Sequence, residues 1–245
     1  AIAVGVSPDV RGELHAFPGA VEDLQAGRLR VLHDRSFVDD PTRLIRLARY
    51  GIRLGLVLHP RTEQLARAAF ADDAPATVGV ARMARELWLL LSEPDPVRCL
   101  LLLADLAGDE MDDNPGPIPL PGMQLAVEPS IVNDTRRLLP EDAAHEHALL
   151  ATIVGERDPA ALRAWLDAAH VTRPEIVLDA ARDPAALARA MWAAQRPSEL
   201  AAAVRGRSVE AVAVAGACGP KDEARRWLEE LRHVKLDITG ADLLA

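Results

Sequence analysis

Apolar and polar residues repeat with helical spacing along most of the chain, and only the first 35 residues follow another pattern. Residues 2–6 form an apolar run typical of a strand, and residues 13–16 follow a turn and are expected to pair back as a hairpin. A short helical pattern closes at Gly27, and residues 28–32 alternate as a half-buried strand does. Residues 1–35 are therefore predicted to form a small mixed α/β region.

Residues 36–108 show the spacing of amphipathic helices. Helical segments are expected from residue 41 to Gly55 and over 60–71, 78–91 and 94–106. The stretch 109–122 is first acidic and then rich in proline and glycine, which is typical of a linker or a long loop. We expect a domain boundary there.

Residues 123–245 are alanine-rich and predicted to be helical. Residues 157–162 and 182–187 nearly repeat, each with an aspartate before a proline and an apolar stripe that reaches Trp165 or Trp192. A helical-repeat array would produce such a pattern, but shared capping chemistry explains two copies more simply.

The helix expected after residue 40 has an unusual polar face. Asp39 or Asp40 can cap its first turn, Pro41 fits the first helical position, and Gly55 supplies a left-handed stop. At 100° per residue, four arginines share one side and four apolar residues the other: Arg43, Arg46, Arg49 and Arg53 against Leu44, Ile45, Ala48 and Ile52. Such a stripe suits a phosphate or a polyanion.

Asp40 and Arg43 lie three residues apart and are therefore neighbours near the start of this helix. An aspartate accepts hydrogen bonds and an arginine donates them, so the pair offers an acceptor beside a donor. Cytosine and adenine present an amino donor beside a ring-nitrogen acceptor, whereas uracil and guanine present a carbonyl at the amino position. The pair can therefore read C and A, although an ordinary surface ion pair has the same spacing.

The segment around this helix resembles the E-D-P-x-R-x-x-R-A-x-R-F-x-x-R-L-G-F motif of tRNA nucleotidyltransferases and bacterial poly(A) polymerases. It reads Asp-Asp-Pro-Thr-Arg-Leu-Ile-Arg over 39–46, Ala-Arg-Tyr over 48–50 and Arg-Leu-Gly over 53–55. The resemblance covers nearly the first 108 residues through further matches at 12–14, 19–30, 80–87 and 93–96, with a short match at 237–244.

The resemblance implies that the motif is the amino-acid template for an incoming CTP or ATP. Asp40 and Arg43 stand at its two base-reading positions, and Asp39 stands where the family usually has Glu. On this basis we expect two groups of binding residues: Asp39, Asp40, Arg43, Arg46 and Arg82 for the nucleotide, and Arg49 and Arg53 for RNA or phosphate. Arg82 and Glu86 would brace the nucleotide pocket, or form an ordinary i,i+4 surface pair.

The resemblance also implies a domain order. Residues 1–35 correspond to the tail of a nucleotidyltransferase head domain, 36–108 to a helical neck, 109–122 to a linker and 123–245 to a helical body and tail that hold the tRNA. Ala16 and Ala20 replace an Asp and a Gly of the family's D-x-x-G-G element. The chain begins without Met, in a strand-like run, and we expect it to be a fragment.

Phosphoryl transfer to an RNA 3′ end needs metal-bound carboxylates. The family carries them ahead of the point where this chain starts, so no catalytic residue and no metal ligand are assigned here. Residues 110–112, Glu-Met-Asp, have a suitable spacing but open the Pro/Gly stretch, which favours a solvated loop. His145 and His147 alternate without a further ligand cluster, which favours a surface helix.

The net charge of −9 is unusual for a dedicated nucleic-acid binder, so any RNA contact must come from a local patch. Cys99 and Cys218 are both expected to be buried free thiols in a reducing compartment. No apolar run reaches the roughly 18 residues that span a bilayer, and a cytoplasmic protein without a membrane partner is expected.

We therefore expect a mainly α protein that forms the neck and body of an RNA 3′-end nucleotidyltransferase, acting in tRNA CCA addition or polyadenylation. Its substrates would be CTP and ATP, its partner a tRNA or another RNA 3′ end, and its cofactor Mg²⁺ held outside this chain. A non-catalytic RNA- or protein-binding module that uses the arginine face, or a helical scaffold without ligands, would share these features.

Overall fold

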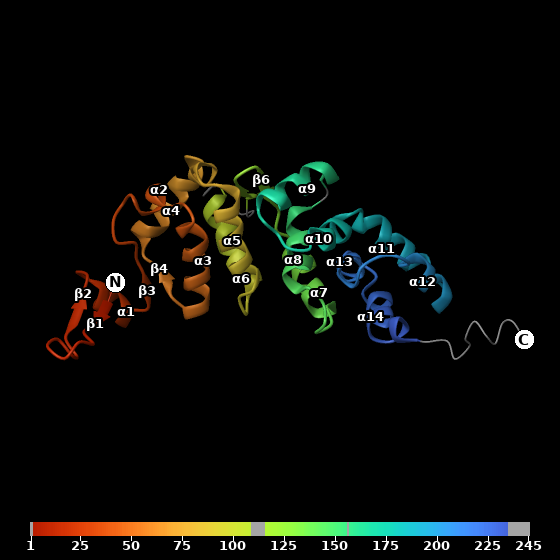
Figure 1. Ribbon diagram of the computed structural model, residues 1–245, viewed down its shortest axis with the longest axis horizontal. Helices are drawn as coiled ribbons and strands as arrows, with labels where there is room; N and C mark the ends of the chain where they lie inside the picture. Colours follow the sequence, from red (N-terminus) through yellow and green to blue (C-terminus); the bar gives the residue numbers. More distant parts are fainter. Residues whose placement is uncertain (1, 109–115, 156, 235–245) are drawn as a thin grey trace, which may run out of the picture. The chain divides into compact units, whose positions relative to one another are not determined.

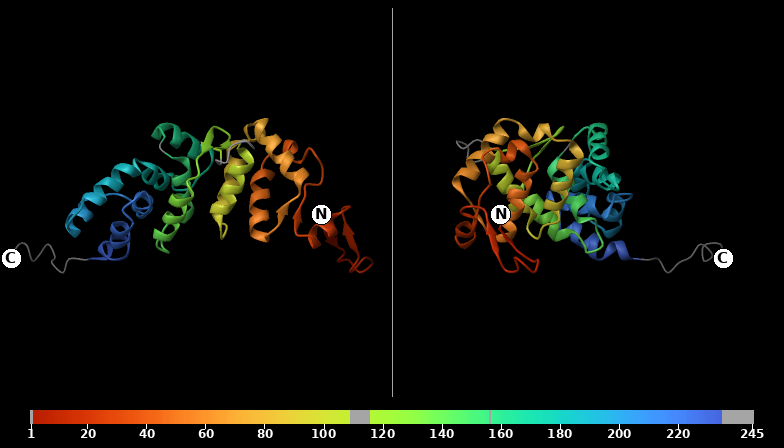
Figure 2. Two further views of the ribbon diagram at one scale, coloured as in Figure 1. Left: turned by 180° about the vertical axis from the view of Figure 1, so that it is seen from behind. Right: turned by 60° about the vertical axis from the view of Figure 1, so that its left-hand side comes forward.

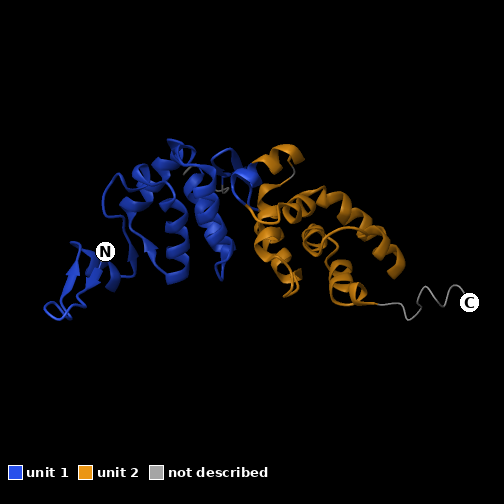
Figure 3. Ribbon diagram, in the orientation of Figure 1, with its two compact units in different colours: residues 1–127, 165–170 blue, residues 128–164, 171–245 orange. Residues whose placement is uncertain are grey.

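The computed structural model describes residues 2–108, 116–155 and 157–234, which fall into two compact units (Figure 3). Unit 1 comprises Ala1–Val127 with Trp165–His170, and unit 2 comprises Glu128–Ala164 with Val171–Ala245. In the described residues the α-helices far outnumber the short strands, which confirms the mainly α prediction. The domain divisions after residues 35, 108 and 122 stay predictions.

Unit 1 begins with the small α/β region. Strands β1 (Ile2–Val4) and β2 (Leu14–Ala16) form the predicted antiparallel hairpin, and helix α1 (Ala20–Gln25) follows (Figure 1). Strand β3 covers only Arg28–Leu29, which is shorter than predicted, and pairs in parallel with β4 (Val57–Leu58). This pairing joins the chain that precedes α2 to the chain that directly follows the arginine-rich helix.

The rest of unit 1 is a group of helices around the arginine-rich helix α3 (Arg43–Leu54), which packs against α5 (Val80–Leu91) and α6 (Pro96–Ala107). The apolar side of α3 is buried as predicted, with Leu44, Ile45 and Ala48 at most 2% exposed. In Figures 1 and 2, α3 (orange) lies beside α6 (yellow-green). The other elements of this group are α2 (Ser36–Asp39), α4 (Pro60–Ala71) and the 3₁₀ turn η1 (Ala74–Thr77).

Within the Pro/Gly stretch, Ile118–Leu120 forms a strand, so the expectation of a loop was wrong for these three residues. Strands β5 (Ile118–Leu120) and β6 (Met123–Leu125) form an antiparallel hairpin that turns at Gly122, where φ is 69°. Ile118 and Leu125 are each 1% exposed, and the indole N–H of Trp165 donates to the carbonyl of Pro121 at 3.0 Å. Alternating apolar residues and one buried hydrogen bond therefore override the Pro/Gly composition.

Unit 2 is helical and centres on α13 (Val209–Ala217), whose residues from Glu210 onward are all buried. Helix α13 packs against five other helices, and Gly216 lets α14 approach closely, since a Cβ there would lie 2.3 Å from Cβ of Ala224. The helices assigned wholly or partly to this unit are α7 (Pro129–Leu138), α8 (His145–Val154), α9 (Pro159–Ala168), α10 (Pro174–Ala181), α11 (Pro184–Ala193), α12 (Pro197–Ala203), α13, α14 (Lys221–Glu229) and the 3₁₀ turn η2 (Leu231–His233).

Three sequence expectations in this half have clear outcomes. The capping chemistry of the near-repeat is confirmed, because Asp158 accepts from the N–H of Ala161 and Asp183 from that of Ala186, both at 2.8 Å. The burial of Cys218 was wrong, since this residue is exposed at the end of α13. The surface position of the histidine pair was wrong for His147, which is buried.

Candidate nucleotide and RNA interface

Helix α3 begins later than the sequence suggested, and Asp40 explains why. Thr42 is its N-cap, and Oδ1 of Asp40 accepts from the N–H of Thr42 at 3.2 Å and from its hydroxyl at 2.6 Å. Asp40 therefore fixes the turn before the helix rather than capping its first turn, and Pro41 lies outside it. The C-terminal stop is as predicted: Gly55 is left-handed, with φ of 63°.

The two expected base-reading side chains lie side by side. Nε of Arg43 is 4.0 Å from Oδ2 of Asp40, which makes this a loose ion pair. Nη1 of Arg43 donates to the carbonyl of Ser36 at 3.1 Å, so the guanidinium is also anchored to α2. A half-exposed donor thus lies next to a carboxylate oxygen that accepts no hydrogen bond from the described residues.

Arg82 reaches Asp40 from helix α5. Its Nη2 donates to Oδ1 of Asp40 at 3.1 Å, so the i,i+4 surface pair with Glu86 is not formed. Partial burial alone would raise the pKa of Asp40, but the hydrogen bonds from Thr42 and the charges of Arg82 and Arg43 outweigh it and lower the pKa below its usual value of 3.8. Asp40 is therefore an ionised acceptor at neutral pH.

Two carboxylates hold the remaining arginines of α3: Glu86, which was expected to pair with Arg82, and Glu93, for which no role was expected. Glu86 accepts from Arg46 at 2.7 Å and from Arg49 at 3.1 Å. Glu93, which follows α5, accepts from Arg49 at 3.0 Å and from Arg53 at 3.3 Å. The signal for both in the sequence is that they fall in the segments 80–87 and 93–96, which resemble the family, whereas their partners on α3 are far away in the chain.

Arg49 differs from the other arginines of its helix because its side chain is only 9% exposed. It bridges the two glutamates and holds α3 to α5, and its guanidinium lies 5.8 Å from the ring centre of Tyr50. This placement favours a bracing role over the contact with RNA expected from the sequence. Arg46 and Arg53 remain half-exposed, and the hydrogen bond with Glu86 raises the pKa of Arg46 further.

We define the α3–α5 cluster as Asp40, Arg43, Arg46, Arg49, Arg53, Arg82, Glu86 and Glu93. It contains five guanidiniums and three carboxylates, which leaves two positive charges uncompensated. The carboxylate side chains are at most 17% exposed, whereas every guanidinium except that of Arg49 is at least 42% exposed. The cluster therefore presents positive charge to the solvent in a protein that is acidic overall.

Asp39 lies apart from this cluster. It belongs to helix α2, where its carboxylate is 3.3 Å from Arg35 and 3.9 Å from His33. The structure therefore brings Asp40, Arg43 and Arg82 together and leaves Asp39 with other partners.

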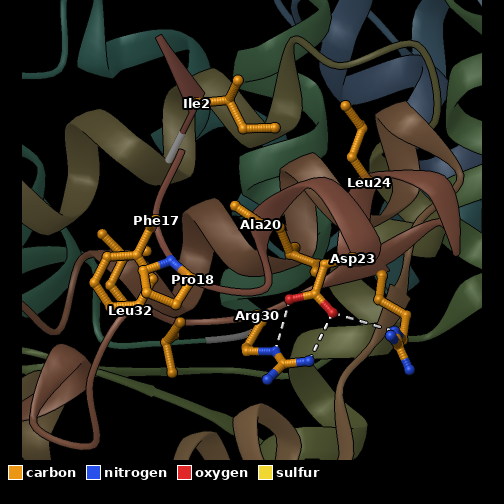
Figure 4. Close-up of a pocket in the computed structure, with 11 residues that line it drawn as sticks. Ile2, Phe17, Pro18, Ala20, Asp23, Leu24, Arg30 and Leu32 are labelled. Carbon is orange, nitrogen blue, oxygen red and sulfur yellow. Dashed lines mark hydrogen bonds and ion pairs between the residues drawn. The ribbon is translucent and has the colours of Figure 1, made fainter. Parts of the chain in front are cut away.

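A hollow of about 290 Å³ in the α/β region contains another carboxylate, Asp23 (Figure 4). Arg30 binds both of its oxygens, at 2.6 and 2.7 Å, and Arg28 lies 3.2 Å away. The hydrogen bond from Arg30 lowers the pKa of Asp23 despite its burial. Because both oxygens are occupied, Asp23 braces α1 against β3 and is not poised to hold a metal ion.

No metal site is evident in the residues that the structure describes. No group of three or more His, Cys, Asp or Glu side chains in those ranges could hold an ion, so nothing there fits the Mg²⁺ that the resemblance implies. Residues 110–112 lie outside the described residues. His147 instead places Nε2 2.7 Å from the carbonyl of Thr172. Within the described ranges, no helix is both long and apolar enough to cross a membrane.

Comparison with solved structures gives the class of fold. The chain superposes on a CCA-adding enzyme in complex with ATP with a TM-score of 0.79 and 23% identity, covering 99% of this chain and 60% of that one. A Thermotoga maritima CCA-adding enzyme in complex with tRNA gives a TM-score of 0.79 at 24% identity, over 99% and 61% of the two chains. The fold is that of part of a CCA-adding enzyme.

No protein-family model matches the chain. Comparison with individual protein sequences, however, identifies the kind of enzyme to which the chain is similar. The chain is 38% identical over 105 residues to the A-adding tRNA nucleotidyltransferase of Geobacter sulfurreducens and 43% identical over 100 residues to the CC-adding enzyme of Deinococcus radiodurans. These matches cover 43% and 39% of this chain but only 12% and 25% of the relatives. Its homologues are therefore tRNA nucleotidyltransferases, as the motif indicated.

Proposed function

We propose that this chain is part of an RNA 3′-end nucleotidyltransferase that acts on a tRNA or another RNA with CTP and ATP as substrates. The observation that carries the proposal is the α3–α5 cluster, in which Asp40, Arg43 and Arg82 converge on an outward-facing surface with surplus positive charge. The homologous tRNA nucleotidyltransferases and the fold of CCA-adding enzymes support it.

Asp40 and Arg43 would read the incoming base. Oδ2 of Asp40 is available to accept from the amino group of cytosine or adenine, and the half-exposed guanidinium of Arg43 is available to donate to the adjacent ring nitrogen. Uracil and guanine present a carbonyl oxygen where Asp40 needs a donor. The ionised state of Asp40 therefore favours C and A over U and G.

Arg46, Arg53 and Arg82 would contact triphosphate or RNA phosphate. Each is at least 43% exposed, although each already has one carboxylate partner. Glu86 holds the guanidinium of Arg46, Glu93 that of Arg53 and Asp40 that of Arg82, and all three guanidiniums stay exposed to solvent. Arg49 would act only by joining α3 to α5.

Isothermal titration of the 245-residue chain with CTP, ATP, UTP and GTP tests this proposal. CTP and ATP are expected to bind more tightly than UTP and GTP, and Arg43→Ala is expected to weaken both by about tenfold, as for loss of one charged hydrogen bond. Arg98→Ala is the matched control, because Arg98 is an exposed arginine outside the cluster.

Equal affinity for all four nucleotides, unchanged by Arg43→Ala, would contradict base reading. If the chain then still bound RNA with a steep salt dependence, the non-catalytic binding module would explain the arginine face instead. Binding of neither nucleotides nor RNA would favour a helical scaffold.

A further inference from the structure

Unit 2 has a hollow with an exposed aromatic ring and a charged side chain to which no role has been assigned above. A hollow of about 460 Å³ opens between helix α11 and the residues that follow α13, and this volume is within the range of small-molecule sites. Ala185, Ala188 and Pro220 contribute to an apolar lining, while Trp192 and Arg189 supply the only aromatic ring and the only charge.

Trp192 leaves 65% of its surface exposed, which is unusual for the largest apolar side chain. The other tryptophan of the near-repeat, Trp165, is 6% exposed and donates its indole N–H to Pro121. The indole of Trp192 donates to no described residue, and one part of its ring rests on Gly219, where a Cβ would come within 3.2 Å of Cζ3. The ring is thus supported by backbone and open to solvent.

Arg189 lies one helical turn before Trp192 and is exposed. It has no acidic partner among the described residues, whereas Arg182 pairs with Asp179 and Arg196 with Glu199. The hollow therefore combines an exposed aromatic ring with one uncompensated positive charge.

We propose that this hollow binds one unstacked nucleotide of a single-stranded RNA segment, with the base stacked on Trp192 and a phosphate paired with Arg189. A nucleotide supplies both a π-face and an anion, which complement the two groups that the hollow offers. An apolar peptide would match the alanine lining but would bury Arg189 without a partner, at a cost in free energy. The inference rests on the proposed function, because it takes RNA as the partner.

Fluorescence anisotropy with a dye-labelled, unstructured oligo(C) RNA and the 245-residue chain tests the proposal. Trp192→Ala is expected to weaken binding by about fivefold or more, as for loss of one stacked base, while Trp192→Phe keeps a ring and most of the affinity. Arg189→Gln is expected to weaken binding and to flatten its salt dependence. Arg205→Gln is the matched control, since Arg205 is another exposed arginine of unit 2 outside the hollow.

Because Trp192 and Arg189 are exposed, these variants are expected to melt at the wild-type temperature, and thermal unfolding checks this. Unchanged RNA affinity in Trp192→Ala would overturn the proposal, and a protein partner would then be the better candidate for the hollow. A duplex RNA that competes as well as the single strand would also overturn it, because paired bases cannot stack on the indole. Arg43→Ala tests CTP and ATP binding in unit 1, so the two proposals can fail separately.

Discussion

At the scale of single residues, the exposed fraction of each side chain separates arginines that hold the fold from arginines that meet solvent. Arg49 and Arg53 both pair with Glu93 and both lie near the ring of Tyr50, yet their side chains are 9% and 44% exposed. Burial makes the Arg49 pairs expensive to break, because the partner left behind is a charge with little access to water. The same pairing at the half-exposed Arg53 is screened by solvent.

Replacement of Arg49 therefore tests the bracing role. Arg49→Met keeps much of the side-chain volume but removes both ion pairs, and it is expected to lower the free energy of unfolding by about 3 kcal/mol. Arg53→Met is the matched control and is expected to cost about 1 kcal/mol or less. Urea denaturation followed by circular dichroism measures both, and equal losses would contradict the distinction between them.

At the scale of elements, the apolar pattern predicted which helix face is buried in the core. It did not predict features that depend on individual polar contacts. The buried side of α3 and its end at Gly55 follow from periodicity and from one glycine, and both are confirmed. The start of α3 depends on the two hydrogen bonds that Thr42 donates to Asp40. The β5–β6 hairpin depends on packing against residues far away in the chain. Neither feature can be predicted from local composition.

In the candidate site, the sequence likewise predicted contacts between residues close in the chain but not contacts between distant ones. The spacing of Asp40 and Arg43 made them neighbours, whereas Arg82 is 42 residues from Asp40 in the chain and Glu86 is 40 residues from Arg46. Spacing alone paired Arg82 with Glu86, one turn apart on the same helix. Arg82 instead pairs with Asp40 in the turn before α3, and Glu86 pairs with arginines of α3, so only the fold identifies these partners.

The end of α3 permits a test within one helix. Gly55 has a φ of 63° and nothing within 4 Å of a built Cβ, so Gly55→Ala is expected to cost about 1 kcal/mol from backbone strain alone. Gly51 is helical, and a Cβ there meets its neighbours at 3.6 Å or more. Gly51→Ala is therefore expected to stabilise the protein by up to about 1 kcal/mol. Thermal unfolding distinguishes the two, and shifts of the same sign would refute this account.

At the scale of the whole molecule, charge is unevenly distributed. The chain carries 28 Lys and Arg against 37 Asp and Glu, yet the α3–α5 cluster has two surplus positive charges. A local positive surface on an acidic protein limits non-specific attraction to polyanions while favouring one site. The cluster lies in unit 1 and the Trp192 hollow in unit 2, so the two proposed binding surfaces belong to different units.

Transfer of nucleotides to RNA by the 245-residue chain itself can be tested directly. The described residues hold no carboxylate cluster for a metal ion, whereas phosphoryl transfer requires one. The 245-residue chain, incubated with CTP, ATP, Mg²⁺ and a tRNA that lacks its terminal CCA, is therefore expected to leave the RNA length unchanged on a sequencing gel. A tRNA nucleotidyltransferase that extends the same RNA is the positive control. Extension by this chain alone would mean that residues outside the described ranges, such as Glu110 and Asp112, supply the metal ligands.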